Sequence, residues 1–237
     1  MDERLIENSL LFTGTGIFQA MGLSLRPEDC ALLAPAAWLN DQLIAYYFEQ
    51  LGAAADSRGA SVLLLEPSLV HAAAILRDAN ALREMTSVPS TKGEPALIEL
   101  MRTRRLVLMP VNDKGDPSEH EGGGHWSLLV FRRGDAGAPP RFEHYDSCKG
   151  ANSSQARAVA QCFATLLEPN TAGATTQLVS MRTPQQVNGY DCGVYVLCIA
   201  EVLCVTADPA QAAQEIQSIT PEAATVKRDK FRQMLQR

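Results

Sequence analysis

Apolar residues recur at helical spacing in several stretches of the chain. The clearest case is residues 39–51, where six apolar side chains share one helical face: Leu39, Leu43, Ile44, Tyr47, Phe48 and Leu51. The same pattern predicts helices over residues 68–85, with Ser68 as the N-cap, over 96–102 and over 153–167. We expect each of these helices to bury its apolar face against the rest of the fold.

Between these helices the apolar residues change to the pattern of strands. Residues 105–111 form a short apolar run, and a polar, glycine-rich loop follows it. Residues 125–132 and 141–146 are predicted as two strands of a hairpin, and residues 176–181 as a further strand.

The last third of the chain returns to helices. Residues 192–204 are apolar on nearly every face, which is typical of a buried central helix. Thr220 and Pro221 suit the N-cap and first turn of a C-terminal helix. Helices that flank a group of strands indicate an α+β fold.

The predicted hairpin brings two residues with chemical potential together. If its turn centres on the segment from Gly134 to Gly137, His125 lies directly opposite Asp146. Cross-strand partners have Cβ atoms about 4.5–5.5 Å apart, so a carboxylate there can bind the imidazole and select its tautomer. The alternative is that both are ordinary strand-end residues. Nearby His144 has no evident partner and is expected to be structural or solvated.

A cysteine begins the predicted buried helix. The segment from Gln186 to Gly193 runs from a loop into this helix and places Cys192 at its N-terminus. The free N–H groups and the helix dipole favour a thiolate there. Gly193 would let another segment approach closely. Cys148 lacks such a setting and is expected to be a bystander.

Length and charge restrict the class of protein. A chain of 237 residues suits one domain, here residues 1–237. The formal charge of −6 and the lack of a long basic run argue against a nucleic-acid partner. The apolar stretches are shorter than the roughly 20 residues of a membrane helix, and the acidic N-terminus does not resemble a signal peptide. We therefore expect a protein of the cytoplasm or nucleus, without membrane contact.

The cysteines point to free thiols. Six cysteines in 237 residues are too few for a disulfide scaffold, and no C-x-x-C pair occurs. The remaining cysteines are expected to be structural and buried: Cys30, Cys162, Cys198 and Cys204. The spacing of Cys192, Cys198 and Cys204 does not converge on a metal, so neither a metal nor a cofactor is expected.

Four motifs together resemble one family of enzymes. They are Trp38-Leu39-Asn40-Asp41, Gly124-His125-Trp126-Ser127-Leu128-Leu129-Val130, His144-Tyr145-Asp146-Ser147 and Gln186-x-Asn188-x-x-Asp191-Cys192-Gly193. In this order they resemble the Ulp/SENP cysteine proteases of ubiquitin-like modifiers, over about residues 38–204. The HYDS sequence, the pattern QQxNxYDCGxYVxCxxExLC and the short chain are most similar to the deneddylase branch. SUMO proteases share the triad but match these details less well.

The resemblance implies a papain-like fold and specific roles for four residues. Cys192 would be the nucleophile, and His125 would be its base and later protonate the leaving amine. Asp146 would orient and support the imidazolium. Gln186 would donate its side-chain amide to the oxyanion, together with the Cys192 N–H. The alternative for Gln186 is an ordinary polar loop residue.

The resemblance also implies a substrate-binding role for both tryptophans of the chain. In the family, such residues cover the C-terminal Gly-Gly of the modifier, and a narrow aromatic slot rejects any residue with a Cβ. Core packing is the alternative for both, and we consider it stronger for Trp38 than for Trp126. Asp41 would hold the modifier's tail by main-chain bonds or an arginine contact, or else be a plain acid at a helix N-terminus.

The leading hypothesis for function is a thiol protease that processes or removes a ubiquitin-like modifier of the Nedd/Rub type. Its partners would be that modifier and its conjugates, and we expect a monomer. The alternatives are a SUMO-specific protease, an acyltransferase that uses the same His-Asp-Cys triad, and a binding module without catalysis. The filled catalytic positions argue against the last. The loops at 88–95 and 133–140 carry no motif and could alter the choice of partner.

Overall fold

A five-stranded mixed sheet lies at the centre of the molecule. The computed structural model describes residues 18–20, 23–88, 95–113, 124–134, 137–167 and 177–235. The strands, in sheet order, are β3 (Val62–Leu64), β4 (Leu106–Asn112), β5 (Trp126–Arg132), β6 (Arg141–Tyr145) and β7 (Gln177–Ser180). β3 runs parallel to β4 and β6 to β7, whereas β4, β5 and β6 pair antiparallel. The expected α+β fold with a mixed central sheet is confirmed.

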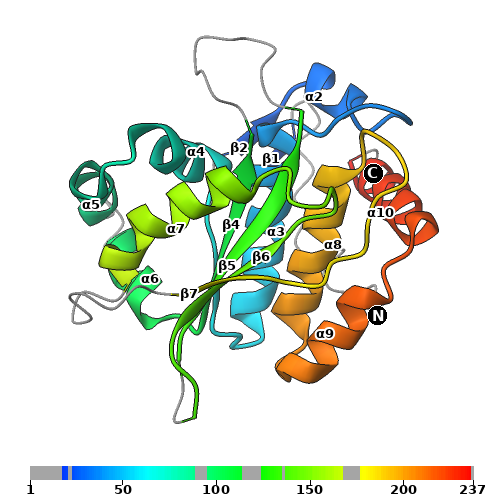
Figure 1. The fold of residues 1–237 in the computed structure, drawn as a ribbon. Helices are drawn as coiled ribbons and strands as arrows, with labels where there is room; N and C mark the ends of the chain where they lie inside the picture. Colours follow the sequence, from blue (N-terminus) through cyan, green and yellow to red (C-terminus); the bar gives the residue numbers. More distant parts are fainter. Residues whose placement is uncertain are drawn as a thin grey trace.

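Helices cover both faces of this sheet (Figure 1). They are α2 (Pro27–Ala31), α3 (Asp41–Ser57), α4 (Pro67–Leu76), α5 (Ala79–Ser87), α6 (Leu97–Thr103), α7 (Ser153–Leu167), α8 (Cys192–Val205), α9 (Pro209–Gln217) and α10 (Pro221–Met234). α3 and α8 pack on one face, α4 and α7 on the other, and α9 and α10 pack against α8. β1 (Phe18–Ala20) and β2 (Leu23–Leu25) form a separate antiparallel pair. Among the described residues, no helix is both long and apolar enough to cross a membrane.

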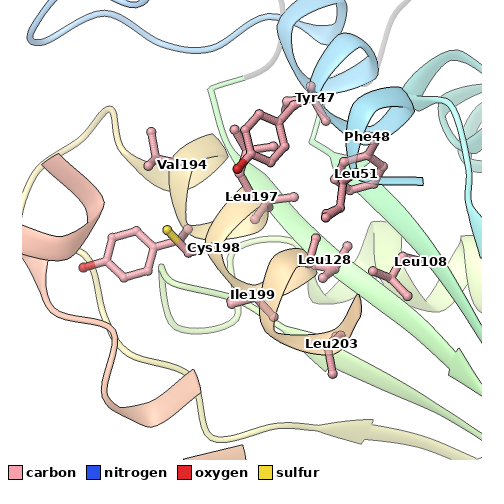
Figure 2. Packing of buried hydrophobic residues seen from close by; sticks show 14 of the residues in the cluster. Tyr47, Phe48, Leu51, Leu108, Leu128, Val194, Leu197, Cys198, Ile199 and Leu203 are labelled. Carbon is pink, nitrogen blue, oxygen red and sulfur yellow. The ribbon is translucent and has the colours of Figure 1, made fainter. Parts of the chain in front are cut away.

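The alternation of side chains along the strands divides the core into two clusters. In β4, Leu108 belongs to the cluster beneath α3 and α8, whereas its neighbour Val107 belongs to the cluster beneath α4 and α7. Figure 2 shows Leu108 and Leu128 of the sheet beside Leu51 of α3 and Leu197 of α8. The central strands are therefore covered on both faces, which explains why they are apolar at nearly every position.

Most predicted elements are present close to their expected bounds. The helix predicted over 153–167 is α7 with the same ends, and the buried helix predicted from Cys192 is α8. The cap at Thr220 is confirmed, since its side chain accepts a hydrogen bond from the N–H of Ala223. The sequence did not predict β1, β2, β3, α2 or α9. These elements are short, at three to nine residues each.

The single helix predicted over 68–85 is wrong, because the chain forms two helices there. α4 ends where Arg77 adopts a left-handed conformation with φ of 50°. Asp78 then caps α5, and its carboxylate accepts the N–H groups of Asn80 and Ala81 at 2.8 and 3.2 Å. Ser68 is not the N-cap either; it is the second residue of α4, after Pro67.

The predicted hairpin register is wrong by two residues. Arg132 pairs with Arg141 and Leu128 with Tyr145, so His125 and Asp146 are not directly opposite each other. The connection between the strands is tight at Gly134, where an added Cβ would lie 2.5 Å from the carbonyl oxygen of Ala138. Because side chains alternate with a period of two, a shift of two residues leaves every side chain on its original face. His125 and Asp146 therefore still lie on the same face.

Candidate active site

The hydrogen bond expected between His125 and Asp146 is present at the end of the sheet. His125 directly precedes β5 and Asp146 directly follows β6, and the distance from His125 Nε2 to Asp146 Oδ1 is 2.6 Å. The carboxylate also accepts the backbone N–H groups of Cys148 and Asn152 at 2.9 and 3.1 Å. These bonds hold the carboxylate in one orientation.

The same contacts determine the charges of the pair. Burial raises the pKa of Asp146, but the hydrogen bonds from His125, Cys148 and Asn152 outweigh it and lower the pKa below its usual value. Burial lowers the pKa of His125, but hydrogen bonds and charge interactions with Asp146 and Cys192 raise it from 6.5 to about 10. The imidazole is therefore a cation at neutral pH.

Asn152 fixes the backbone of His125, a role that no sequence motif indicated. This asparagine is fully buried, and its Nδ2 donates to the carbonyl oxygens of Val111 and His125 at 3.1 and 3.2 Å. The N–H of His125 in turn donates to Asp113 Oδ1 at 2.9 Å. An asparagine before a helix suggests a cap, but here the side chain reaches across to the strands.

The loop of residues 186–191, called the nucleophile loop here because it precedes the expected nucleophile Cys192, leads into α8. The thiol belongs to the first residue of α8 and is buried. Asn188 orders the loop, because its Oδ1 accepts the N–H groups of Tyr190 and Asp191 at 3.1 and 3.0 Å. Its Nδ2 donates to Asp191 Oδ2 at 2.8 Å. The N–H groups in the first turn of a helix have no acceptor within the helix, so an anion is favoured there.

Gly193 allows the close approach that its position suggested. A Cβ on Gly193 would lie 3.0 Å from the Cβ of Leu39, so the residue that approaches α8 is Leu39. The carbonyl oxygen of Leu39 accepts the indole N–H of Trp126 at 2.9 Å. The segment before α3 is thereby held against both α8 and β5.

Gln186 bridges the HYDS segment and the nucleophile loop. Its Oε1 accepts the Ser147 hydroxyl at 2.8 Å, and its Nε2 donates to the carbonyl oxygen of Asn188 at 2.7 Å. An amide nitrogen carries two hydrogens, so the second can serve another acceptor.

The two tryptophans differ in exposure. Core packing was expected more for Trp38 than for Trp126, and the structure shows the opposite. Trp38 is 56% exposed, and its indole N–H donates to the carbonyl oxygen of Gly189 at 2.6 Å. Trp126 is only 8% exposed and packs in the cluster beneath α3 and α8. Asp41 is exposed as the first residue of α3, where an acid is favourable, and Asn40 provides the cap.

Comparison with known proteins identifies the family. Residues 95–235 match the Ulp1 protease family, C-terminal catalytic domain. The chain belongs to the Ulp1 protease family. It is therefore a cysteine-type peptidase, as the four motifs indicated.

Two relatives of this Ulp1-family chain are named as proteases specific for a ubiquitin-like modifier. Sentrin-specific protease 8 of Mus musculus is 32% identical over 224 residues, which cover 93% of this chain and 92% of that protein. NEDD8-specific protease 1 of Arabidopsis thaliana is 32% identical over 180 residues, which cover 76% of this chain and 71% of that protein. Among solved structures, the C-terminal Ulp1 protease domain in complex with Smt3, the yeast ortholog of SUMO, has a TM-score of 0.64 at 16% identity. That match covers 99% of this chain and 95% of that one and shows a shared fold.

Two further buried polar contacts of this Ulp1-family site were not evident from the sequence. His144 was expected to lack a partner, but its Nε2 lies 3.0 Å from the hydroxyl of Ser127. Burial lowers the pKa of His144, so this imidazole is neutral at pH 7. On α10, the guanidinium of Arg228 pairs with Asp191, the residue before Cys192. Neither contact follows from local sequence, since each joins separate elements. Among the described residues, no group of His, Cys, Asp and Glu is suited to hold a metal ion.

Proposed function

We propose that this protein is a thiol protease that cleaves after the C-terminal Gly-Gly of a ubiquitin-like modifier of the Nedd8/Rub type. The observation that carries the proposal is the pairing of His125 with Asp146 beside Cys192 at the N-terminus of α8. The name of the NEDD8-specific protease from Arabidopsis thaliana supports Nedd8 as the modifier. The deneddylase-like motifs of this chain support the same choice.

The proposed reaction begins with attack by the Cys192 thiolate on the carbonyl carbon of the last glycine. The negative charge on the carbonyl oxygen is stabilised by the Cys192 N–H and by the side-chain amide of Gln186. The bond to the leaving amine breaks as protonated His125 donates its proton to the amine nitrogen. A thioester between Cys192 and the modifier remains.

Water then hydrolyses the thioester. His125, now neutral, takes a proton from the water molecule that attacks the thioester carbonyl. The sulfur of Cys192 leaves as a thiolate beside the imidazolium, and the new carboxyl group of the modifier loses its proton to solvent. Asp146 stays ionised throughout and stabilises the positive charge of His125.

The same proposal assigns substrate contacts to three residues. The exposed ring of Trp38 would cover the diglycine tail, and Trp126 would form the deeper wall of the slot. Asp41 would hold the tail from the start of α3, by main-chain bonds or by contact with an arginine of the modifier.

A panel of activity probes tests the proposal. Nedd8, SUMO and ubiquitin, each carrying a C-terminal electrophile, are incubated separately with the protein, and covalent adducts are followed by gel shift. We expect the Nedd8 probe to react fastest and the Cys192→Ala variant to form no adduct. Faster reaction of the SUMO probe would contradict the assignment to Nedd8. Transfer of acetyl groups from acetyl-CoA, without reaction of any probe, would instead support an acyltransferase.

A further inference from the structure

The side chain of Arg228 uses its full hydrogen-bonding capacity. It is 4% exposed, and its five N–H groups make five hydrogen bonds. Nε and Nη2 donate to Asp191 Oδ1 at 3.1 and 2.9 Å, Nη2 to the Tyr190 carbonyl at 3.2 Å, and Nη1 to the carbonyls of Leu32 and Ala34 at 3.1 and 3.4 Å. Such a set of bonds fixes the guanidinium in one orientation.

The hydrogen bonds of Arg228 to Tyr190 and Asp191 hold the residues that directly precede α8. Asp191 is the N-cap residue of α8, but its side chain makes no capping hydrogen bond. Its two oxygens are instead bound by Arg228 and by Asn188. The position of Cys192, the next residue, therefore depends on α10, which packs beside α8 (Figure 1).

The remaining hydrogen bonds of Arg228 hold residues 32–34, which precede Trp38 of the proposed substrate slot. The carbonyl groups of Leu32 and Ala34 lie a few residues before Trp38. Trp38 in turn bonds to the carbonyl of Gly189, within the nucleophile loop. Arg228 thus contacts both the loop before Cys192 and the segment before Trp38. These two segments must be correctly placed relative to each other for the diglycine tail to lie over the sulfur of Cys192.

We infer that Arg228 is a positioning residue that sets the placement of Cys192 relative to Trp38. This inference rests on the proposed function, because it concerns the fit of a diglycine tail between the two residues. Lysine cannot substitute for it, since an ammonium has three donors and no planar fork. Arg228 of α10, which lies outside the four motifs, thereby supports the active site from a neighbouring helix.

Two labelling reactions of the Arg228→Lys variant test the inference. The first uses Nedd8 with a C-terminal electrophile, which reacts only if the tail lies correctly over Cys192. The second uses iodoacetamide, a small reagent that needs the thiol but no slot. Both are measured in a Cys30→Ser/Cys148→Ala background, because Cys148 is exposed and Cys30, which was expected to be buried, is only half-buried, so both would also be alkylated. Circular dichroism checks that each variant is folded.

We expect the Nedd8 probe rate to fall by about tenfold or more, since small displacements of reacting groups have effects of this size. The iodoacetamide rate should change by less than about threefold, because no slot is needed for it. The matched control is Lys227→Met, on the same helix, which removes the Lys227–Glu201 ion pair (2.6 Å) away from the nucleophile loop. In this control the ratio of the two rates should equal that of the wild type.

An equal fall of both rates, or no fall in either, would overturn the inference. If Arg228→Lys does not fold, Asp191→Asn decides, because it weakens the same pair from the other side and should show the same selective loss. Failure of the proposed function has a different signature. In that case the wild-type protein reacts with iodoacetamide at Cys192 but with no modifier probe.

Discussion

His125 carries the positive charge that the proposed reaction requires, because its neighbours raise its pKa. Burial alone would make the imidazole neutral, but Asp146 and Cys192 reverse this effect and raise the pKa to about 10. Asp146 can do so because its own carboxylate accepts two backbone N–H groups besides the imidazole. At the residue scale, the site therefore depends on a short chain of hydrogen bonds from the start of α7 to the thiol.

Replacement of Cys192 by alanine should abolish turnover and leave modifier binding largely intact. The sulfur forms the acyl intermediate but contributes little to a broad protein interface. Hydrolysis of a fluorogenic Nedd8 substrate and the affinity for Nedd8 measure the two effects. Cys148→Ala is the matched control and should retain full activity. If Cys148→Ala is the inactive variant, the nucleophile has been misassigned.

Replacement of Asp146 by asparagine should shift the pH dependence of activity. The folded protein holds the His125 proton up to about pH 10, so the wild-type kcat/KM should decline only as the pH approaches that value. Without the carboxylate the pKa of His125 moves toward 6.5, and the alkaline decline should begin at lower pH. Profiles of kcat/KM from pH 6 to about 10.5 measure the shift. An unchanged alkaline limb would show that Asp146 does not control the charge of His125.

The same pKa has a consequence for stability. Because the folded chain binds this proton more tightly than the unfolded chain, the interaction is fully present below pH 6.5. It is lost as the pH rises toward 10. The wild type should therefore lose more stability than Asp146→Asn over this range in urea denaturation.

At the scale of elements, Asn152, a residue outside the family motifs, connects a helix and two strands at the candidate active site. Asn152, the residue before α7, is fully buried and joins this helix to the end of β4 and the start of β5. Its Oδ1 is buried without a hydrogen-bond partner among the described residues. A buried oxygen without a hydrogen bond lowers the stability of the fold. The side chain nevertheless keeps this orientation, in which Nδ2 makes two hydrogen bonds and Oδ1 does not cap α7.

Replacement of Asn152 by alanine should destabilise the protein and weaken catalysis. Two buried carbonyl groups, those of Val111 and His125, would lose a donor, which costs on the order of 1–3 kcal/mol. Chemical denaturation measures this loss. The kcat should fall by about tenfold while KM changes little, because His125 is displaced but the substrate surface is not. A fall in stability with unchanged kcat would mean that Asn152 supports only the fold.

At the scale of the whole molecule, the site lies where segments distant in sequence converge. Trp38 before α3, Gly189 in the nucleophile loop and Arg228 on α10 are linked through hydrogen bonds that span more than a hundred residues of sequence. The fold shared with the Ulp1 protease domain bound to Smt3 covers 99% of the chain. Substrate selection is therefore expected to depend on this assembly rather than on the triad alone.

A substrate whose final glycine is replaced by alanine should be cleaved poorly. A methyl group in a closed slot must displace an aromatic ring, and overpacking of this kind costs roughly 1–3 kcal/mol. At about 1.4 kcal/mol per factor of ten, kcat/KM should fall by several-fold to about a hundredfold. Trp38→Ala should reduce this penalty while it lowers overall activity, and Trp38 is the better residue to replace because it is exposed. Equal cleavage of both substrates by the wild type would contradict a diglycine slot.

Local patterns in the sequence determined much of the fold and the identity of the chemical groups. The helices over 153–167 and from Cys192 were predicted because each has a strong apolar pattern or a clear cap. The His125–Asp146 contact was predicted from the hairpin, even though the register was wrong by two residues. The prediction survived because side-chain facing depends only on the parity of the register.

Other features were decided only by the tertiary structure. The break between α4 and α5 depends on the conformation of Arg77, and the hairpin register depends on how β5 and β6 pair within the whole sheet. The exposure of Trp38 and the burial of Trp126 depend on which segments cover them. Arg228 has no local pattern, because an arginine on a helix is usually solvated. Its role follows from contacts with residues nearly two hundred positions earlier, which local periodicity cannot encode.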